Sequence, residues 1–199
     1  MIDVIIPSIK TEEEIFPLAA KMRETDEVNV ILSCGNQSAA KNRNSGLARA
    51  SSEYVIMCDD DIYGFFPGWA SKLISLFKIG KNVRLVSARL IKASGAYATM
   101  MGSSYDKRSE YEVVKEKHVP SACIAFRLQG APKFDEGFLG SGWEDTWFCD
   151  CLAKTEPEGL FIIDNSVKLI HRNEQKNQVI NHEFNSAHYD NLRKNATKN

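Results

Sequence analysis

Short apolar runs alternate with amphipathic segments along the first half of the chain. The apolar runs have the β-branched composition of buried strands, and they lie at residues 3–7, 29–33, 54–58 and 83–91. The amphipathic segments carry apolar side chains at helical spacing, and they lie at residues 11–23, 38–50 and 69–77. Thr11-Glu-Glu-Glu14 matches a capping box at the start of the first helix. This alternation predicts right-handed crossovers and an α/β fold with a mostly parallel sheet covered by helices on both faces.

The second half of the chain is less regular. Residues 92–117 mix Gly, Ser and charged residues, which predicts an insertion or a hairpin. The elements expected after it are a strand at residues 119–126, a helix at 146–154, and two strands at 160–163 and 167–170. From Arg172 onward the chain is polar, and we expect residues 173–199 to form a polar C-terminal tail.

Composition limits the class of protein. The chain has 199 residues, of which 43% are hydrophobic, and this suits one large domain with its own core. A net charge of -1 argues against a general polyanion-binding surface, so nucleic acid is not an expected partner, although it stays open as an acceptor. Neither a signal-peptide pattern nor a transmembrane run of about 20 apolar residues is present, so we expect a soluble, cytoplasmic protein. The odd number of cysteines, five, favours reduced thiols.

Three carboxylates, Asp59, Asp60 and Asp61, directly follow the apolar run 54–58. In an extended chain, side chains two residues apart point to the same face, so Asp59 and Asp61 can converge while Asp60 points away. Converging carboxylates repel each other unless a cation offsets their charge, and ligands of open α/β sheets bind beyond the carboxyl ends of the strands. The pattern therefore favours a divalent metal with oxygen ligands, whereas a solvated acidic turn is the simpler alternative.

A second acidic pair, Glu144 and Asp145, lies at the expected start of a helix between Trp143 and Trp147. Aromatic faces beside carboxylates suit the apolar face and the hydroxyl rim of a sugar. Capping of the helix by the carboxylates and burial of the tryptophans in the core would also explain these residues.

Two further regions offer candidate ligands. His171 follows the last apolar strand, where a single histidine is more often structural than a ligand. Arg43 and Asn44 fit a solvated helix face, but arginine is also the residue best suited to a diphosphate or a stacked base.

Six motifs occur in a specific order over about residues 2–172. They are Val4-Ile-Ile-Pro7, Lys41-Asn-Arg-Asn-Ser-Gly-Leu47, Glu53-Tyr-Val-Ile-Met-Cys-Asp-Asp-Asp61, Phe134-Asp-Glu-Gly-Phe138, Gly142-Trp-Glu-Asp145 and His171. The ordered set resembles a GT-A glycosyltransferase and is most similar to glycosyltransferase family 2. Gly142-Trp-Glu-Asp145 also resembles the C-terminal motif of galactosyltransferases.

The resemblance implies roles for particular residues. Asp59, Asp61 and His171 would bind Mn²⁺ or Mg²⁺, Asp145 would be the catalytic base beside Glu144, and Trp143 with Glu144 would contact the acceptor. The nucleotide sugar would contact Pro7, Ser8, Asn36, Arg43, Asn44, Asp59 and Asp60. Many relatives have a carboxylate after the second strand that contacts the base, and here Ser33-Cys-Gly-Asn36 takes its place, so the identity of the base stays open.

We therefore expect a single GT-A domain over residues 1–172, with a nucleotide-binding half at 1–91 and an acceptor or catalytic half at 119–172. Such a domain would transfer one sugar from a nucleotide-diphosphate donor, expected to be a UDP-sugar, to a hydroxyl of a glycan, glycolipid or other acceptor, with inversion. Two alternatives stay open: a sugar-phosphate nucleotidyltransferase and a non-catalytic carbohydrate-binding module. A nucleotidyltransferase would have a Gly-rich loop with Arg and Lys near its N-terminus, and this chain lacks such a loop after Pro7. A binding module would need neither a metal pair nor a base.

Overall fold

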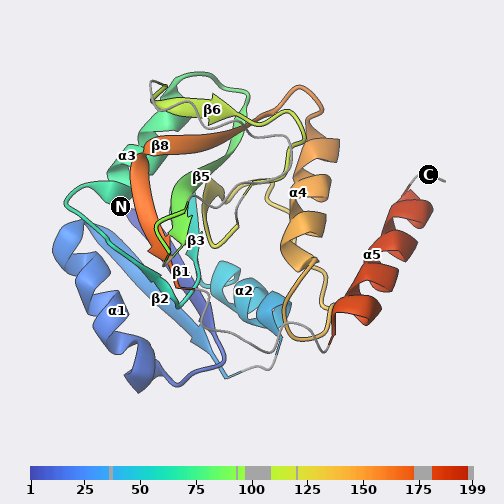
Figure 1. Ribbon diagram of the computed structural model, residues 1–199, viewed down its shortest axis with the longest axis horizontal. Helices are drawn as coiled ribbons and strands as arrows, with labels where there is room; N and C mark the ends of the chain where they lie inside the picture. Colours follow the sequence, from blue (N-terminus) through green and yellow to red (C-terminus); the bar gives the residue numbers. More distant parts are fainter. Residues whose placement is uncertain (36–37, 93, 97–108, 120, 173–180, 197–199) are drawn as a thin grey trace.

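One mixed sheet runs through the molecule and brings distant parts of the chain to a common edge (Figure 1). The computed structural model describes residues 1–35, 38–92, 94–96, 109–119, 121–172 and 181–196. The strands are β1 (Ile2–Ser8), β2 (Val28–Cys34), β3 (Tyr54–Cys58), β4 (Ile62–Tyr63), β5 (Val83–Lys92), β6 (Tyr111–Val113), β7 (Cys123–Arg127) and β8 (Leu160–His171). The helices are α1 (Glu12–Thr25), α2 (Ala39–Leu47), α3 (Trp69–Ser75), the 3₁₀ turn η1 (Leu76–Lys78), α4 (Glu144–Thr155) and α5 (His182–Ala196).

The strand order is β2-β1-β3-β7-β5-β8-β4, and β6 pairs with β8. Strand β1 is parallel to β2 and β3, and β5 is parallel to β8. Strand β7 is antiparallel to both of its neighbours, β3 and β5, so these two strands share one direction. The strands β1, β2, β3, β5 and β8 therefore all point the same way, which confirms the expected mostly parallel α/β sheet.

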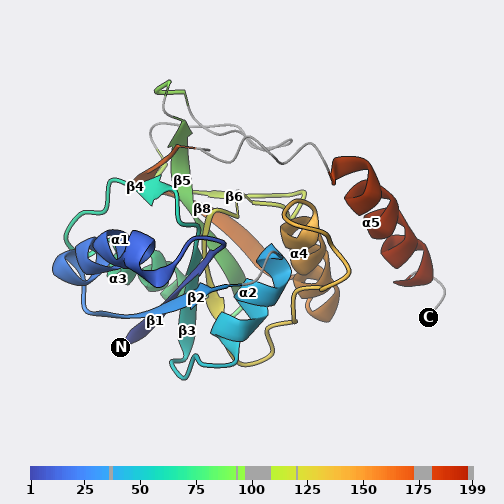
Figure 2. The ribbon, with the colours of Figure 1, turned by 90° about the horizontal axis from the view of Figure 1, so that it is seen from below.

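Helices cover both faces of the sheet (Figures 1 and 2). Side chains alternate along each strand, so neighbouring residues of β1 enter different cores. Val4 packs with residues of α1 and α3, whereas Ile5 packs with residues of α2 and α4. The continuous apolar runs of the sequence therefore mark strands that are buried on both faces, as expected.

Helix α2 lies unusually close to β1. A Cβ atom added at Gly46 would clash with the Cγ2 atom of Ile5, which is fully buried. Glycine at this position lets the helix approach the sheet, and this approach places the polar first turns of α2 beside the carboxyl end of β1.

Strand β8 is longer than the sequence indicated. The polar residues 164–166 predicted a break between two strands, but β8 continues through them with an irregularity in its register against β5. The Asp164 carboxylate accepts hydrogen bonds from the backbone N–H groups of Ser166 and Val167 at 2.7 and 3.3 Å. These bonds satisfy backbone groups that the bulge removes from the ladder, so the chain stays in one strand.

Half of the region expected as an insertion or a hairpin lies outside the described residues, including the β-prone piece at 97–100. Its described part contains the short edge strand β6, which pairs antiparallel with β8.

The C-terminal segment contains a helix that the sequence did not predict. Helix α5 runs from His182 to Ala196 beside α4 (Figure 1) and buries Asn185 and Tyr189. Its buried face combines a polar and an aromatic side chain, so it lacks the apolar stripe by which an amphipathic helix is recognised. None of the helices in the described part of the chain combines the length and the hydropathy that a membrane-spanning segment requires.

Candidate functional site

Three chain segments meet at the carboxyl edge of the parallel strands. Asp59 follows β3, Asp61 immediately precedes β4, and His171 is the last residue of β8. Antiparallel pairing of β4 with β8 sets Ile62 opposite His171, which brings the imidazole to the acidic turn. The sheet thus joins residues that are more than one hundred positions apart in the sequence.

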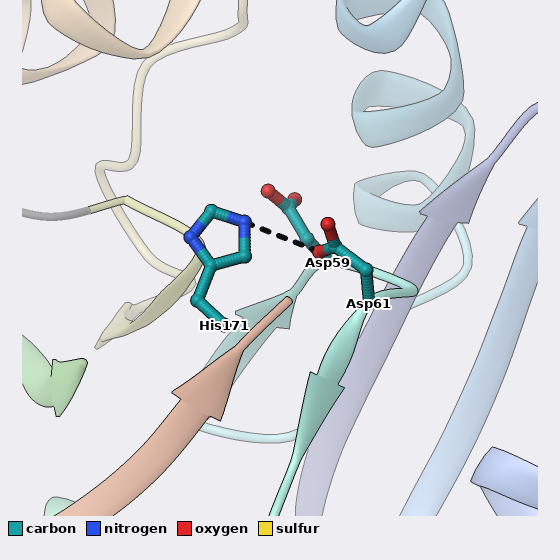
Figure 3. Close-up of side chains that lie close together, drawn as sticks. All are labelled: Asp59, Asp61 and His171. Carbon is teal, nitrogen blue, oxygen red and sulfur yellow. Dashed lines mark ion pairs between the residues drawn. The ribbon is translucent and has the colours of Figure 1, made fainter. Parts of the chain in front are cut away.

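The side chains of Asp59, Asp61 and His171 point toward one another (Figure 3). One ligand atom from each residue can be chosen so that all three atoms lie within 4.8 Å of one another. The His171 Nε2 atom lies 3.3 Å from the Asp61 Oδ1 atom. Two carboxylates and one imidazole form a donor set that suits Mn²⁺ or Mg²⁺ better than a purely soft metal, so the residues fit the expected ion.

Burial and neighbouring charges shift the pKa values of Asp59 and His171 in this cluster. Burial raises the pKa of Asp59 to about 6; Arg43 opposes this rise and the neighbouring Asp61 carboxylate adds to it. The hydrogen bond to Asp61 raises the pKa of His171 above its ordinary value, although burial opposes the rise. The Asp61 carboxylate thus contributes to both pKa shifts, as a smaller cause than burial for Asp59 and as the main cause for His171, and a divalent cation would offset its charge.

Asp60 points away from the other two carboxylates, as expected from the alternation of side chains. It is buried and accepts a hydrogen bond from the Ser8 hydroxyl, and the Lys10 ammonium lies 3.5 Å from its carboxylate. Pro7 is buried in β1 opposite Ser33 of β2. Asn36 lies outside the described residues. The structure therefore places Ser8 and Asp60 together at the end of β1, and Asp60 lies in the chain between Asp59 and Asp61 of the candidate metal cluster.

Arg43 bridges the two acidic motifs. Its guanidinium forms an ion pair with Glu144 of α4 and lies 3.1 Å from the Asp59 carboxylate. Burial lowers the pKa of Arg43, but Glu144 and Asp59 outweigh this effect and raise it above the ordinary value. Burial raises the pKa of Glu144, and Arg43 opposes that rise. The two motifs are therefore joined by a buried, charged contact.

Asn44 connects α2 to the loop that follows β7. Its amide nitrogen donates to the Phe134 carbonyl and to Glu136, both at 2.9 Å, and its amide oxygen accepts from the Phe134 backbone N–H. The structure thus gives Asn44 a role in holding the loop. Its expected contact with the nucleotide stays a prediction.

The turn before α4 has a strained backbone. Gly140 and Gly142 have positive φ angles, and so does Trp143, at 72°. A bulky residue rarely adopts this conformation, and such strain is concentrated at functional sites. The turn buries Glu144 toward Arg43 and leaves Asp145 half-buried, where it accepts a hydrogen bond from the Ser121 hydroxyl. Helix α4 begins at Glu144, two residues earlier than predicted.

Comparison with known proteins identifies the family. Residues 9–138 match the family described as Glycosyl transferase family 2. The chain belongs to this family. The match includes Arg43, Asp59 and Asp61 but ends before Gly142-Trp-Glu-Asp145, so the likeness of that motif to galactosyltransferases stays a prediction. A search of curated proteins found no match.

A solved structure supports the fold of this family 2 domain. The crystal structure of S. aureus TarS 1-349 matches with a TM-score of 0.61 at 12% sequence identity. The match covers 86% of this chain and 60% of the TarS chain, so this chain spans less than two thirds of that length. The likeness confirms the GT-A fold, whereas the roles of single residues need their own tests.

Sequence patterns missed several residues and contacts of the candidate site. Ser121 binds Asp145, but a lone serine before a strand gives no signal. The partners of Arg43 were also missed, because Glu144 lies 101 positions away and only the fold brings it close. Asn185 of α5 contacts the turn at residues 139–142, called the glycine-rich turn below. Nothing in the polar C-terminal segment predicted this contact.

Proposed function

We propose that the domain transfers one sugar from a nucleotide-diphosphate sugar, with a UDP-sugar as the expected donor, to an acceptor hydroxyl. The observation that carries the proposal is the convergence of Asp59, Asp61 and His171 within 4.8 Å at the carboxyl edge of the sheet. Membership of glycosyl transferase family 2 supports sugar transfer as the reaction class. The edge of the sheet is also where ligands of open α/β folds bind.

The donor side of the proposed site consists of the end of β1 and the acidic turn. Asp59, Asp61 and His171 would hold Mn²⁺ or Mg²⁺. The bound ion would neutralise charge on the departing diphosphate as a Lewis acid. Ser8 and Asp60 lie beside the cluster and would contact the nucleotide, together with Pro7 and Asn36.

Asp145 is the proposed general base, and the reaction proceeds with inversion. A sugar hydroxyl is a weak nucleophile, so a carboxylate that removes its proton accelerates attack on the anomeric carbon. Asp145 is half-buried and oriented by the Ser121 hydroxyl. The carbonyl of the next residue, Ala122, accepts from the Asp59 backbone N–H at 2.8 Å, so Asp145 and the metal-binding cluster share one support.

Glu144 has a different role in this proposal. Its side chain is 3% exposed and forms an ion pair with Arg43, so it is poorly placed to exchange protons with an acceptor in solution. Glu144 therefore fixes the start of α4 and the position of its neighbours, Asp145 and Trp143. The acceptor contact expected for Glu144 is therefore proposed to be indirect, through the position that Glu144 gives to Trp143 and Asp145.

A donor screen tests the proposal. The protein is incubated with a panel of UDP-sugars with Mn²⁺ or with a chelator, and slow hydrolysis by water is followed by NMR. We expect Mn²⁺-dependent release of UDP and a sugar whose anomeric configuration is inverted at the moment of release. Formation of a nucleotide sugar from UTP and a sugar phosphate would instead show a nucleotidyltransferase, and sugar binding without turnover would show a binding module.

A further inference from the structure

Asn185 of α5 is a polar side chain with no solvent exposure, and its hydrogen-bonding groups face the glycine-rich turn. Its Oδ1 atom accepts from the Leu139 N–H at 2.8 Å. Its Nδ2 atom donates to the carbonyls of Leu139 and Gly142 at 2.9 and 3.1 Å and lies 3.5 Å from that of Ser141. One amide thus contacts several backbone groups of a single turn, and burial of such a group is stable because it is satisfied.

The same turn is held from its other side by α2. The backbone N–H of Ala39 donates to the Gly140 carbonyl at 2.8 Å. The turn then continues into Trp143, whose indole packs against the Tyr189 ring of α5 with a centroid distance of 5.0 Å. The segment that carries Glu144 and Asp145 is therefore clamped between α2, at the donor side, and α5.

A small pocket lies where the turn, α4 and α5 meet. It has a volume of ≈ 200 Å³ and is lined by Ser141, Gly142, Trp143, Thr146 and His182. Sites for drug-sized ligands measure about 300–1,000 Å³, so this pocket suits a single ring. An indole beside hydroxyl and imidazole groups matches a pyranose, which has an apolar face and a polar rim. The pocket also borders the segment that carries Asp145.

We propose that α5 completes the acceptor site, with His182 on the wall of a pocket for one acceptor pyranose and Asn185 as the positioning residue of the turn. This inference rests on the proposed function, because it assigns the acceptor side of that same site. Asn185 acts through the backbone: it holds Trp143, the residue that precedes α4, in its left-handed conformation and so fixes where the first turn of α4 places Asp145.

Helix α5 is also held against α4 by contacts that do not involve Asn185. These contacts allow the effect of Asn185 on the turn to be distinguished from its effect on the attachment of α5. The Tyr189 hydroxyl donates to the Asp150 carboxylate at 2.7 Å, and the Asp150 carboxylate also lies 2.9 Å from His118 Nε2. These contacts reach α4 beyond the turn. Tyr189→Phe removes one anchor of α5 but keeps the ring beside Trp143, so it is a matched control for Asn185→Ala.

The first measurement is hydrogen–deuterium exchange of the full chain. In Asn185→Ala, we expect amides of residues 136–145 to exchange at least about tenfold faster, because they lose their clamp. Exchange in β1 and β3 should stay unchanged, and Tyr189→Phe should leave residues 136–145 protected. Unchanged exchange of the turn in Asn185→Ala, or equal acceleration in Tyr189→Phe, would overturn the positioning role.

The second measurement is saturation-transfer NMR with a panel of methyl pyranosides in the presence of UDP and Mn²⁺. We expect saturation transfer to at least one pyranoside in the unaltered protein and its loss in His182→Ala and Asn185→Ala. Calorimetric UDP affinity should change less than about twofold in both variants. Saturation transfer to no pyranoside, or retained transfer in His182→Ala, would overturn the acceptor assignment. Absence of metal-dependent UDP binding in the unaltered protein would instead contradict the proposed function, which keeps the two failures distinct.

Discussion

Arg43 and Glu144 form an ion pair in which the side chains are only 6% and 3% exposed. Arg43 comes from α2 and Glu144 is the first residue of α4, so the pair joins two helices across the candidate site. The second contact of Arg43, with Asp59, connects the pair to the candidate metal cluster of Asp59, Asp61 and His171. The two acidic motifs, at Asp59–Asp61 and at Glu144-Asp145, therefore share one buried positive charge, that of Arg43.

Arg43→Met should strongly destabilise the fold. Removing one partner of a buried ion pair leaves an uncompensated charge, at a cost of about 3–5 kcal/mol in the free energy of unfolding. Urea unfolding measures this loss. The double variant Arg43→Met with Glu144→Gln should recover part of the lost stability. In this variant the residue at position 144 is neutral, so α4 no longer buries an unpaired carboxylate.

Arg84→Met is the matched control for this change. Its ion pair with Glu156, which is 45% exposed, should be worth less than about 1 kcal/mol. Equal destabilisation by the two arginine substitutions would show that burial of the Arg43 pair has no special importance.

Asp145→Asn should lower the rate of sugar transfer by about 10² to 10⁴, because the amide cannot take the acceptor proton. Nucleotide and metal affinity should stay nearly unchanged, since the shape and the contact with Ser121 are kept. Steady-state kinetics with a donor found in the screen gives the rate, and Asp190→Asn, an exposed carboxylate of α5, provides the control. Near-normal transfer by the Asp145→Asn variant, or a product of retained configuration, would reject Asp145 as the base.

Asp3→Asn should make stability less dependent on pH. Burial raises the pKa of Asp3, but hydrogen bonds from Ser52, Asn29 and Ser51 outweigh it, so the pKa lies below its ordinary value. A carboxyl group with a lowered pKa stabilises the fold above the unfolded pKa, near 3.8, and this contribution is lost as pH falls through the folded pKa. The variant should cost about 1.5–3 kcal/mol at pH 7. Urea unfolding from pH 7 to pH 3 should show the two proteins converging; a constant difference would contradict this origin.

His171→Ala should weaken Mn²⁺-dependent nucleotide binding roughly tenfold or more, since loss of outer-shell partners alone typically costs 10- to 100-fold. The fold should survive, because the imidazole is 25% exposed at the end of β8. His188→Ala is the matched control: this histidine also lies near a carboxylate, Asp135 at 3.0 Å, and is 27% exposed. Equal metal affinity in the two variants would return His171 to a structural role.

Much of the fold could be predicted from local patterns. The apolar runs of β1, β2, β3 and β5 and the capping box at Thr11 act over a few residues, so the sequence shows them directly. The convergence of Asp59 and Asp61 followed from the alternation of an extended chain, and the structure brings His171 to them.

Other features depend on contacts that no local pattern contains. Strand β8 continues through polar residues because the Asp164 side chain satisfies the bulge. Helix α5 docks through Asn185, a residue type that usually indicates a turn, and Arg43 meets Glu144 only in the folded chain. Each of these is a polar contact made across the fold, whereas hydrophobic periodicity reports only which side of an element is buried.

Calorimetric titration of UDP into the unaltered protein and into Asp61→Asn, with Mn²⁺ and with a chelator, tests the central claim most directly. Asp61 is buried, lies next to His171 and belongs to the only cluster of such ligands found among the described residues. We predict that Mn²⁺ strengthens UDP binding at least about tenfold in the unaltered protein and has no effect in Asp61→Asn, because this substitution removes one of the two carboxylates that would hold the ion. UDP affinity that is independent of Mn²⁺, or an equal Mn²⁺ effect in both proteins, would contradict a metal-dependent nucleotide site at Asp59, Asp61 and His171.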